Sequence, residues 1–150
     1  MPIQLYPGYD AYSDVNLLGL CVWREARGEI YDAKFGVACS IRNRVNHPTW
    51  WGHNYHEVIL EKWQYTSFDP SDPNSTKFPG ATDPAYLECL EAASCVINGK
   101  MTDTTGGASS YFDKSLDTHP PKWATDGSNI HTADLGHLHF YERKQDVQEA

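Results

Sequence analysis

Apolar residues recur three and four positions apart along the first two thirds of the chain, a pattern typical of helices with one buried face. The predicted helices cover about residues 13–26, 33–46, 56–63 and 83–97. Ser13, Asp32 and Asp83 are suited to cap three of them, and Pro84 suits a first helical turn. A loop rich in Pro, Ser and Asp is expected at residues 69–82.

The pattern changes after Gly99, where a polar and turn-rich stretch begins. Alternating residues predict short strands at 108–112 and 136–141, whereas residues 113–135 show little periodicity. The end of the chain, from about Glu142, is charged and expected to be frayed. The 150 residues therefore predict a single domain of the mainly helical α+β class, with a small β element in the C-terminal third.

The segment Trp23–Glu29, W-R-E-A-R-G-E, offers two carboxylates near the end of an apolar helix. Glu25 falls in register with Val15, Leu18 and Val22, which form the expected buried stripe. A carboxylate at the end of such a stripe loses hydration, and desolvation raises its pKa. A raised pKa is what a general acid requires near neutral pH, so Glu25 is the leading catalytic candidate.

The arginines leave an alternative open. Glu25 would be an ordinary helix-end residue if it paired with Arg24 or Arg27, since structural ion pairs also perturb pKa values. Arg42 and Arg44 add to a local excess of positive charge in the first third of the chain. For these two we favour the simpler interpretation of solvated helix faces.

Composition narrows the classes of partner and location. The formal net charge of −8 disfavours nucleic acid, and no apolar run is long enough to span a membrane. The first residues lack the basic and apolar regions of a signal peptide, so the chain is expected to be cytoplasmic until it is released. The four cysteines lie in predicted helices without C-x-x-C spacing, and buried free thiols are expected.

Three constellations could carry chemistry. The first combines Glu25 with side chains that stack on or hydrogen-bond to sugars, namely Gln64, Tyr65, Tyr111, Trp123 and Tyr141. The second is a histidine cluster that would need a metal: His137 and His139, two apart on a strand and so on one face, with His131 or Asp134. The third is a serine nucleophile, disfavoured because no G-x-S-x-G motif surrounds Ser67, Ser109 or Ser110.

The order of motifs resembles that of a known family. W-R-E-A-R-G-E, followed by G-V-A-C-S-I-R-N-R-V at residues 36–45, resembles the E-[AS]-R-G-E signature and N-R-V helix of the spore cortex-lytic SleB-type cell wall hydrolases. The resemblance covers about residues 13–142. Its further elements are Val58-Ile59, Gln64 to Phe68, Asp103, Thr105, Gly107, Ala108, Tyr111, Trp123, Ile130 and Gly136 to Tyr141.

The resemblance implies a lysozyme-like fold and a lytic transglycosylase that acts on the glycan strands of peptidoglycan. It implies that Glu25 is the single acid and base, and that no cofactor or metal is needed. Glu29 matches the second glutamate and would orient groups in the cleft. The residues expected to contact substrate are Glu29, Gln64, Ser67, Tyr111, His137 and His139.

Three rival functions remain open. The same glutamate could serve a hydrolytic muramidase, the histidines could serve a metal-dependent wall peptidase or amidase, and the scaffold could be a non-catalytic binding module. The loop at residues 69–82 looks enlarged relative to the family pattern. The absence of a signal peptide and of a binding module suits a stand-alone, phage-type lysin that a holin releases, and a monomer is expected.

Overall fold

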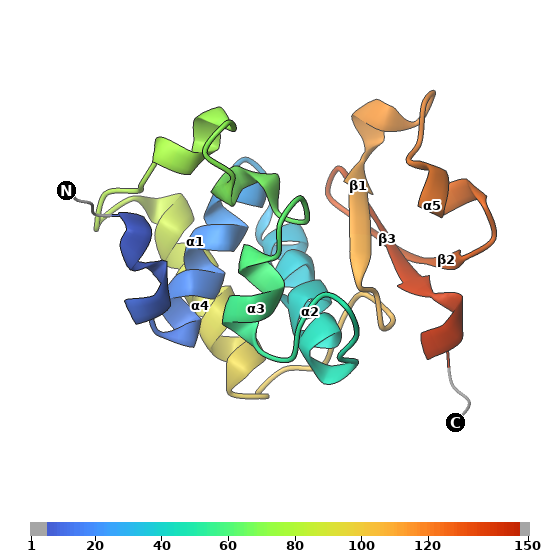
Figure 1. The fold of residues 1–150 in the computed structure, drawn as a ribbon, viewed down its shortest axis with the longest axis horizontal. Coiled ribbons are helices and arrows are strands. Elements are labelled where there is room, and N and C mark those ends of the chain that lie inside the picture. The colour runs from blue at the N-terminus through green and yellow to red at the C-terminus, as the bar shows by residue number, and fades with distance from the viewer. Residues whose placement is uncertain (1–5, 148–150) are drawn as a thin grey trace.

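The computed structural model describes residues 6–147 and gathers four helices at one end and a small sheet at the other (Figure 1). The helices are α1 (Asp14–Ala26), α2 (Tyr31–Asn46), α3 (Tyr55–Leu60), α4 (Pro84–Ile97) and the short α5 (Lys122–Thr125). The strands are β1 (Ser110–Asp113), β2 (Asn129–Leu135) and β3 (Leu138–Arg143). Short 3₁₀ helices cover Tyr6–Ala11, Thr66–Phe68, Pro73–Thr76, Lys114–Leu116 and Lys144–Asp146. The mainly helical α+β class is thus confirmed.

Local capping explains where two helices begin. Ser13 Oγ accepts a hydrogen bond from the Asn16 amide at 3.1 Å, as expected for the start of α1. Asp83 Oδ1 accepts from the Ala85 amide at 2.9 Å, with Pro84 as the first residue of α4. The predicted Asp32 cap is wrong, because α2 already begins at Tyr31. Asp32 lies in the first turn of α2, where its negative charge interacts favourably with the helix dipole.

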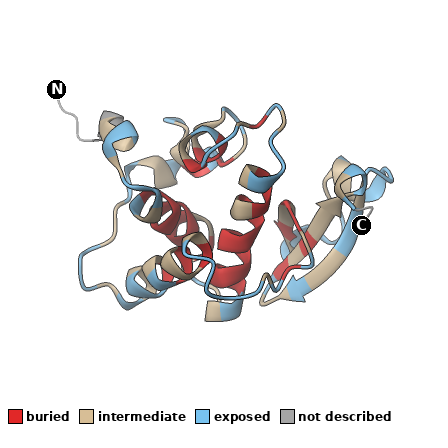
Figure 2. Ribbon diagram, turned by 90° about the horizontal axis from the view of Figure 1, so that it is seen from below, coloured by how far each residue is buried: buried red, intermediate tan, exposed pale blue. Residues whose placement is uncertain are grey.

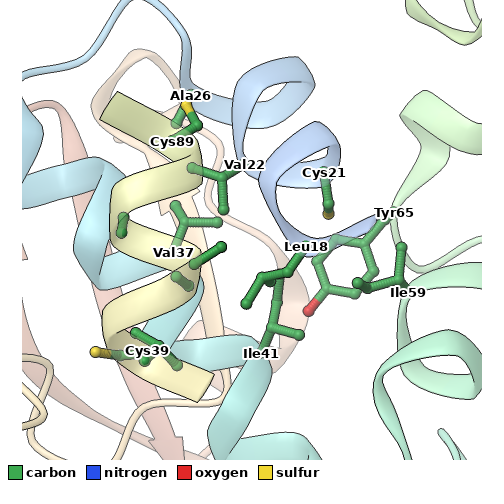
Figure 3. Close-up of a cluster of buried hydrophobic side chains, with 14 of the residues drawn as sticks. Leu18, Cys21, Val22, Ala26, Val37, Cys39, Ile41, Ile59, Tyr65 and Cys89 are labelled. Atoms are coloured by element: carbon green, nitrogen blue, oxygen red, sulfur yellow. The ribbon is translucent and has the colours of Figure 1, made fainter. Parts of the chain in front are cut away.

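The core forms where α1, α2 and α4 pack together. Figure 2 shows buried residues concentrated in the helices and in the part of the sheet that faces them. Leu18, Val22 and Ile41 are fully buried, and Figure 3 shows them among the side chains that fill this core. Leu87 of α4 points away from this core and is 50% exposed.

The sheet is antiparallel, with strand order β1-β3-β2. Leu138 and Phe140 of β3 are buried on the face toward the helices. Gly36 of α2 permits this packing, because a Cβ there would lie 2.9 Å from the Phe140 ring. Strand β2 and helix α5 lie in the stretch without periodicity and were not predicted. The prediction of fraying from Glu142 is wrong as far as Asp146, because β3 continues to Arg143 and the 3₁₀ helix Lys144–Asp146 follows it.

The remaining expectations concern the cysteine thiols and membrane-spanning segments. All four cysteines are free, and Cys21, Cys39 and Cys89 are buried as predicted. Within residues 6–147, no helix combines the length and apolarity needed to cross a membrane.

Candidate active site

A cavity of about 440 Å³ lies where the helices meet the sheet. Its lining residues come from α1, α2, the segments around residues 50 and 64, the three strands and α5. They are Glu25, Arg44, Trp50, Trp51, Trp63, Gln64, Tyr65, Ser110, Tyr111, Trp123, Asn129 and Arg143. Sequence positions more than 100 residues apart therefore meet around the last turn of α1.

Glu25 presents its carboxyl group to this cavity and is held by two hydroxyl groups. Tyr111 donates to Oε1 at 2.7 Å, and Ser67 donates to Oε2 at 3.0 Å. Burial raises the pKa of Glu25, while the hydrogen bonds from Tyr111 and Ser67 lower it in part, and the net shift is upward. The structure thus gives Glu25 a carboxyl group that is both desolvated and oriented, the two properties that a proton donor requires.

Arg24 does not pair with Glu25 and instead holds the neighbouring segment. Its buried guanidinium donates to the backbone carbonyls of Ser67 at 3.3 Å, Ser75 at 3.2 Å and Lys77 at 3.2 Å. The adjacent Arg27 donates to Asn74 Oδ1 at 2.9 Å. The alternative of an ion-paired Glu25 is therefore wrong. The two arginines fasten the expected loop at residues 69–82, and Arg24 also fixes the backbone of Ser67.

Tyr111 is positioned from α2 through the turn that precedes β1. Asn43 donates to Asp103 Oδ2 at 2.9 Å and to the Ala108 carbonyl at 2.8 Å. Asp103 also accepts from the Thr105 amide and hydroxyl at 2.8 and 2.7 Å. Although burial favours its neutral form, these hydrogen bonds lower the pKa of Asp103 overall. The carboxylate therefore organises the turn that leads the chain to Tyr111.

Arg44 was predicted to lie on a solvated helix face, and that prediction is wrong. It is 8% exposed and donates to the Ser109 carbonyl at 2.7 Å, to Gln64 Oε1 at 3.0 Å and to Ser110 Oγ at 3.3 Å. Its guanidinium also lies 4.6 Å from the centroid of the Trp51 ring. Arg44 therefore joins three parts of the cavity wall and fixes the amide of Gln64.

Glu29 lies outside the cavity lining and contacts the turn between β2 and β3. It accepts from the His137 amide at 2.8 Å, and the His137 ring lies 3.2 Å from its Oε2. Gly136 has a left-handed φ of +57°, and a Cβ there would lie 2.5 Å from Glu29 Oε1. This contact ties the hairpin to the α1–α2 junction. Substrate contact by Glu29 and His137 remains a prediction.

His139 lies on the face of β3 opposite to Phe140 and is likewise outside the cavity lining. Its ring nitrogens lie 2.6 Å from Asp134 Oδ1 and 2.8 Å from Asp117 Oδ1. The hydrogen bond to Asp134 raises the pKa of His139. The expectation that His137 and His139 share a strand face is wrong, because β3 begins at Leu138 and His137 lies in the turn. Substrate contact by His139 remains a prediction.

Of the other predicted sugar contacts, Gln64, Tyr65, Tyr111 and Trp123 line the cavity, whereas Tyr141 does not. Ser67 reaches the site through its bond to Glu25.

Trp50 and Trp63 also line the cavity with exposed side chains, and neither was predicted as a site residue. Trp63 has a φ of +69°, a costly conformation for a bulky side chain, and such strain is concentrated at functional sites. An exposed indole in a cavity is suited to stack on a sugar ring, but no spacing rule in the sequence marks it.

Residues 28–141 match the Cell Wall Hydrolase family, a range that covers most of the chain. The chain belongs to this cell wall hydrolase family. The sequence-based resemblance is thereby confirmed. The family match begins at Gly28, so it includes Glu29, whereas Glu25 precedes it.

Two curated relatives of this cell wall hydrolase are spore cortex-lytic enzymes. That of Halalkalibacterium halodurans is 34% identical over 112 residues, which are 75% of this chain and 31% of the relative. That of Bacillus subtilis is 32% identical over 117 residues, which are 78% of this chain and 35% of the relative. The chain thus spans about a third of the length of the curated relatives it matches.

A solved structure has a similar fold. The catalytic domain of the germination-specific lytic transglycosylase SleB from Bacillus anthracis superposes with a TM-score of 0.65 at 28% identity. The match covers 87% of this chain and 97% of that domain. The fold predicted from the resemblance is therefore confirmed along almost the whole of a SleB catalytic domain.

Proposed function

We propose that this cell wall hydrolase cleaves the glycan strands of peptidoglycan between N-acetylmuramic acid and N-acetylglucosamine, as a lytic transglycosylase. The observation that carries the proposal is the composition of the cavity wall. Among the described residues that line it, Glu25 is the only carboxylate. Family membership and the similarity to a lytic transglycosylase domain support the substrate class.

One carboxyl group suffices for this reaction if the substrate supplies the nucleophile. Protonated Glu25 donates its proton to the glycosidic oxygen, and the bond between that oxygen and C1 of the muramic acid breaks. The C6 hydroxyl of the same sugar then attacks C1 and gives its proton to Glu25. A 1,6-anhydro ring closes, and the acid is regenerated without consumption of water.

The neighbours of Glu25 suit both halves of this cycle. Burial favours the protonated acid that the first step requires. The hydroxyl groups of Tyr111 and Ser67 stabilise the carboxylate that the first step creates, because both donate to it. We assign Gln64 to hydrogen bonding with the sugar, and we assign the exposed indoles of Trp50 and Trp63 to stacking.

Hydrolysis is the alternative outcome at the same site. A hydrolase normally requires a second carboxylate, either to activate water or to form a covalent intermediate. Asp72 lies close enough for its charge to contribute to the raised pKa of Glu25. However, Asp72 accepts from the Asn74 amide at 2.8 Å, where it caps the 3₁₀ helix Pro73–Thr76, and it is not among the lining residues. This arrangement favours the transglycosylase.

Digestion of purified peptidoglycan, with the soluble products read by mass spectrometry, tests the proposal. We expect glycan fragments with 1,6-anhydro-muramic ends from the wild-type protein and none from Glu25→Gln. The matched control is Glu91→Gln, which changes an exposed glutamate on α4 and should retain full activity. Release of free peptides instead of glycan fragments would refute glycan cleavage and favour a peptidase or amidase. Substantial activity of Glu25→Gln would refute the assignment of Glu25 as the catalytic acid.

A further inference from the structure

Three metal-ligating side chains converge on the face of the sheet that points away from the helices. His131 Nε2 lies 2.7 Å from Asp134 Oδ1, and His139 Nδ1 lies 2.6 Å from the same oxygen. The donor atoms of the three residues all lie within 4.8 Å of one another. None of the three lines the cavity around Glu25, so the cluster is a separate feature of the fold.

A β-bulge brings these side chains together. His131 and Asp134 are three positions apart, so in a regular strand they would point to opposite faces. The register of β2 against β3 shifts between His131 and Ala133, which inserts one extra residue into β2. Beyond the bulge, Asp134 faces His139 across the strand pair. Bulges of this kind redirect side chains, and here the bulge places His131 and Asp134 of β2 on the same face.

A second carboxylate, that of Asp117, contacts the ring nitrogen of His139 that does not face Asp134. The other ring nitrogen of His139, Nε2, lies 2.8 Å from Asp117 Oδ1, at the end of the 3₁₀ helix Lys114–Leu116. Histidines that bind metal through one nitrogen nearly always donate the other N–H to a carboxylate or carbonyl group, which fixes the tautomer and the ring orientation. Asp117 is positioned to do this for His139.

We propose that His131, Asp134 and His139 form a binding site for a divalent transition-metal ion of the zinc class, with water as the fourth ligand. Two nitrogens and one carboxylate oxygen are a donor set that suits Zn²⁺. Ligand atoms on a tetrahedral zinc ion lie about 3.3 Å apart, so the three donors require rearrangement on the scale of side-chain rotation. The ion would replace the direct contacts of Asp134 with the two imidazole rings.

The site would be structural, and it does not depend on the proposed function. Strand β2 is an edge strand with no fully buried side chain, and its Ile130 is 42% exposed. A cation would join β2 to β3 and, through Asp117, to the turn after β1. The same strands carry Asn129 and Arg143 to the cavity wall, so the ion would stiffen that wall. This departs from the expectation of no metal, while leaving the chemistry at Glu25 free of one.

Calorimetric titration of the chelator-treated, metal-free full chain with ZnCl₂ tests the site, with thermal melting as a second readout. We expect one zinc ion per chain and a higher melting temperature with zinc. His139→Ala and Asp134→Asn should each weaken binding by at least about tenfold, and Asp117→Asn by about 10–100-fold. His53→Ala is the matched control, because His53 is an exposed histidine beside a single carboxylate, Glu57. This variant should bind zinc as tightly as the wild type does.

Two results would overturn the proposal. One is a wild-type chain that binds zinc no better than Asp134→Asn does. The other is binding that survives His139→Ala unchanged, which would place the ion elsewhere. Circular dichroism of each metal-free variant checks that it is folded, and the exposed His131→Ala provides a further ligand variant that should leave the core intact.

Discussion

Replacing Tyr111 by Phe removes one of the two hydroxyl groups that hold the Glu25 carboxylate, and nothing else from the ring. The bond is short, at 2.7 Å, and it lowers the pKa of Glu25 against the opposing effect of burial. Hydrogen bonds to charged groups contribute about 1.5–3 kcal/mol, and one pKa unit corresponds to about 1.4 kcal/mol. The pKa of Glu25 should therefore rise by about one to two units in Tyr111→Phe.

The pH dependence of kcat/KM reports this change, because it follows ionisations in the free enzyme. Protonated Glu25 begins the reaction, so activity falls as the pH rises through its pKa. Tyr111→Phe should shift that falling limb to higher pH by the same one to two units, with lower maximal activity, since the carboxylate formed in the first step loses a donor.

Tyr65→Phe is the matched control for this measurement. Tyr65 also lines the cavity, but its buried hydroxyl group has no hydrogen-bond partner in the described structure. Its removal should leave the falling limb unchanged. The reasoning would be refuted if Tyr111→Phe left the limb in place, or if Tyr65→Phe moved it equally.

Three further predictions concern the same cavity. Because burial raises the pKa of Glu25, the folded chain holds that proton more tightly than the unfolded chain and loses stability as the pH rises from about 4 through the raised value. Glu25→Gln should therefore melt at a higher temperature than the wild type at pH 7, and an equal gain at pH 3 would contradict this explanation. Arg44→Met leaves Ser109, Ser110 and Gln64 without their shared donor, so kcat/KM should fall by about 10–100-fold, and unchanged kinetics would show that the arginine does not position the cavity wall. Trp63→Ala should raise KM roughly tenfold with little change in kcat if the indole stacks on the sugar, whereas a fall in kcat alone would argue against stacking.

Features set by neighbouring residues were predictable from the sequence. Ser13 and Asp83 cap helices because their side chains reach amides two or three positions ahead. Glu25 could be singled out because it continues the stripe of Leu18 and Val22, whose burial follows from helical periodicity alone. In each case the deciding contacts lie within a few turns of one helix.

Features set by distant residues were not predictable in this way. An arginine on a helix is usually solvated, so nothing in the sequence indicated that Arg44 is buried. Its main-chain partner, the Ser109 carbonyl, lies 65 positions away. Strand β2 escaped detection because partial burial on an edge strand leaves no clean alternation. His137 and His139 were assigned to one strand face, but β3 starts between them, at Leu138. His137 lies in the preceding turn, where its amide donates to the distant Glu29.

The origin of the oxygen in the products tests the central claim most directly. Peptidoglycan digested in water enriched in ¹⁸O should give muramic ends without the heavy isotope, because the C6 hydroxyl, and not water, attacks C1 after Glu25 has protonated the leaving oxygen. Mass spectrometry should show unlabelled 1,6-anhydro ends. Reducing ends that carry ¹⁸O would contradict the account, since they would identify water as the nucleophile and require a second group to activate it.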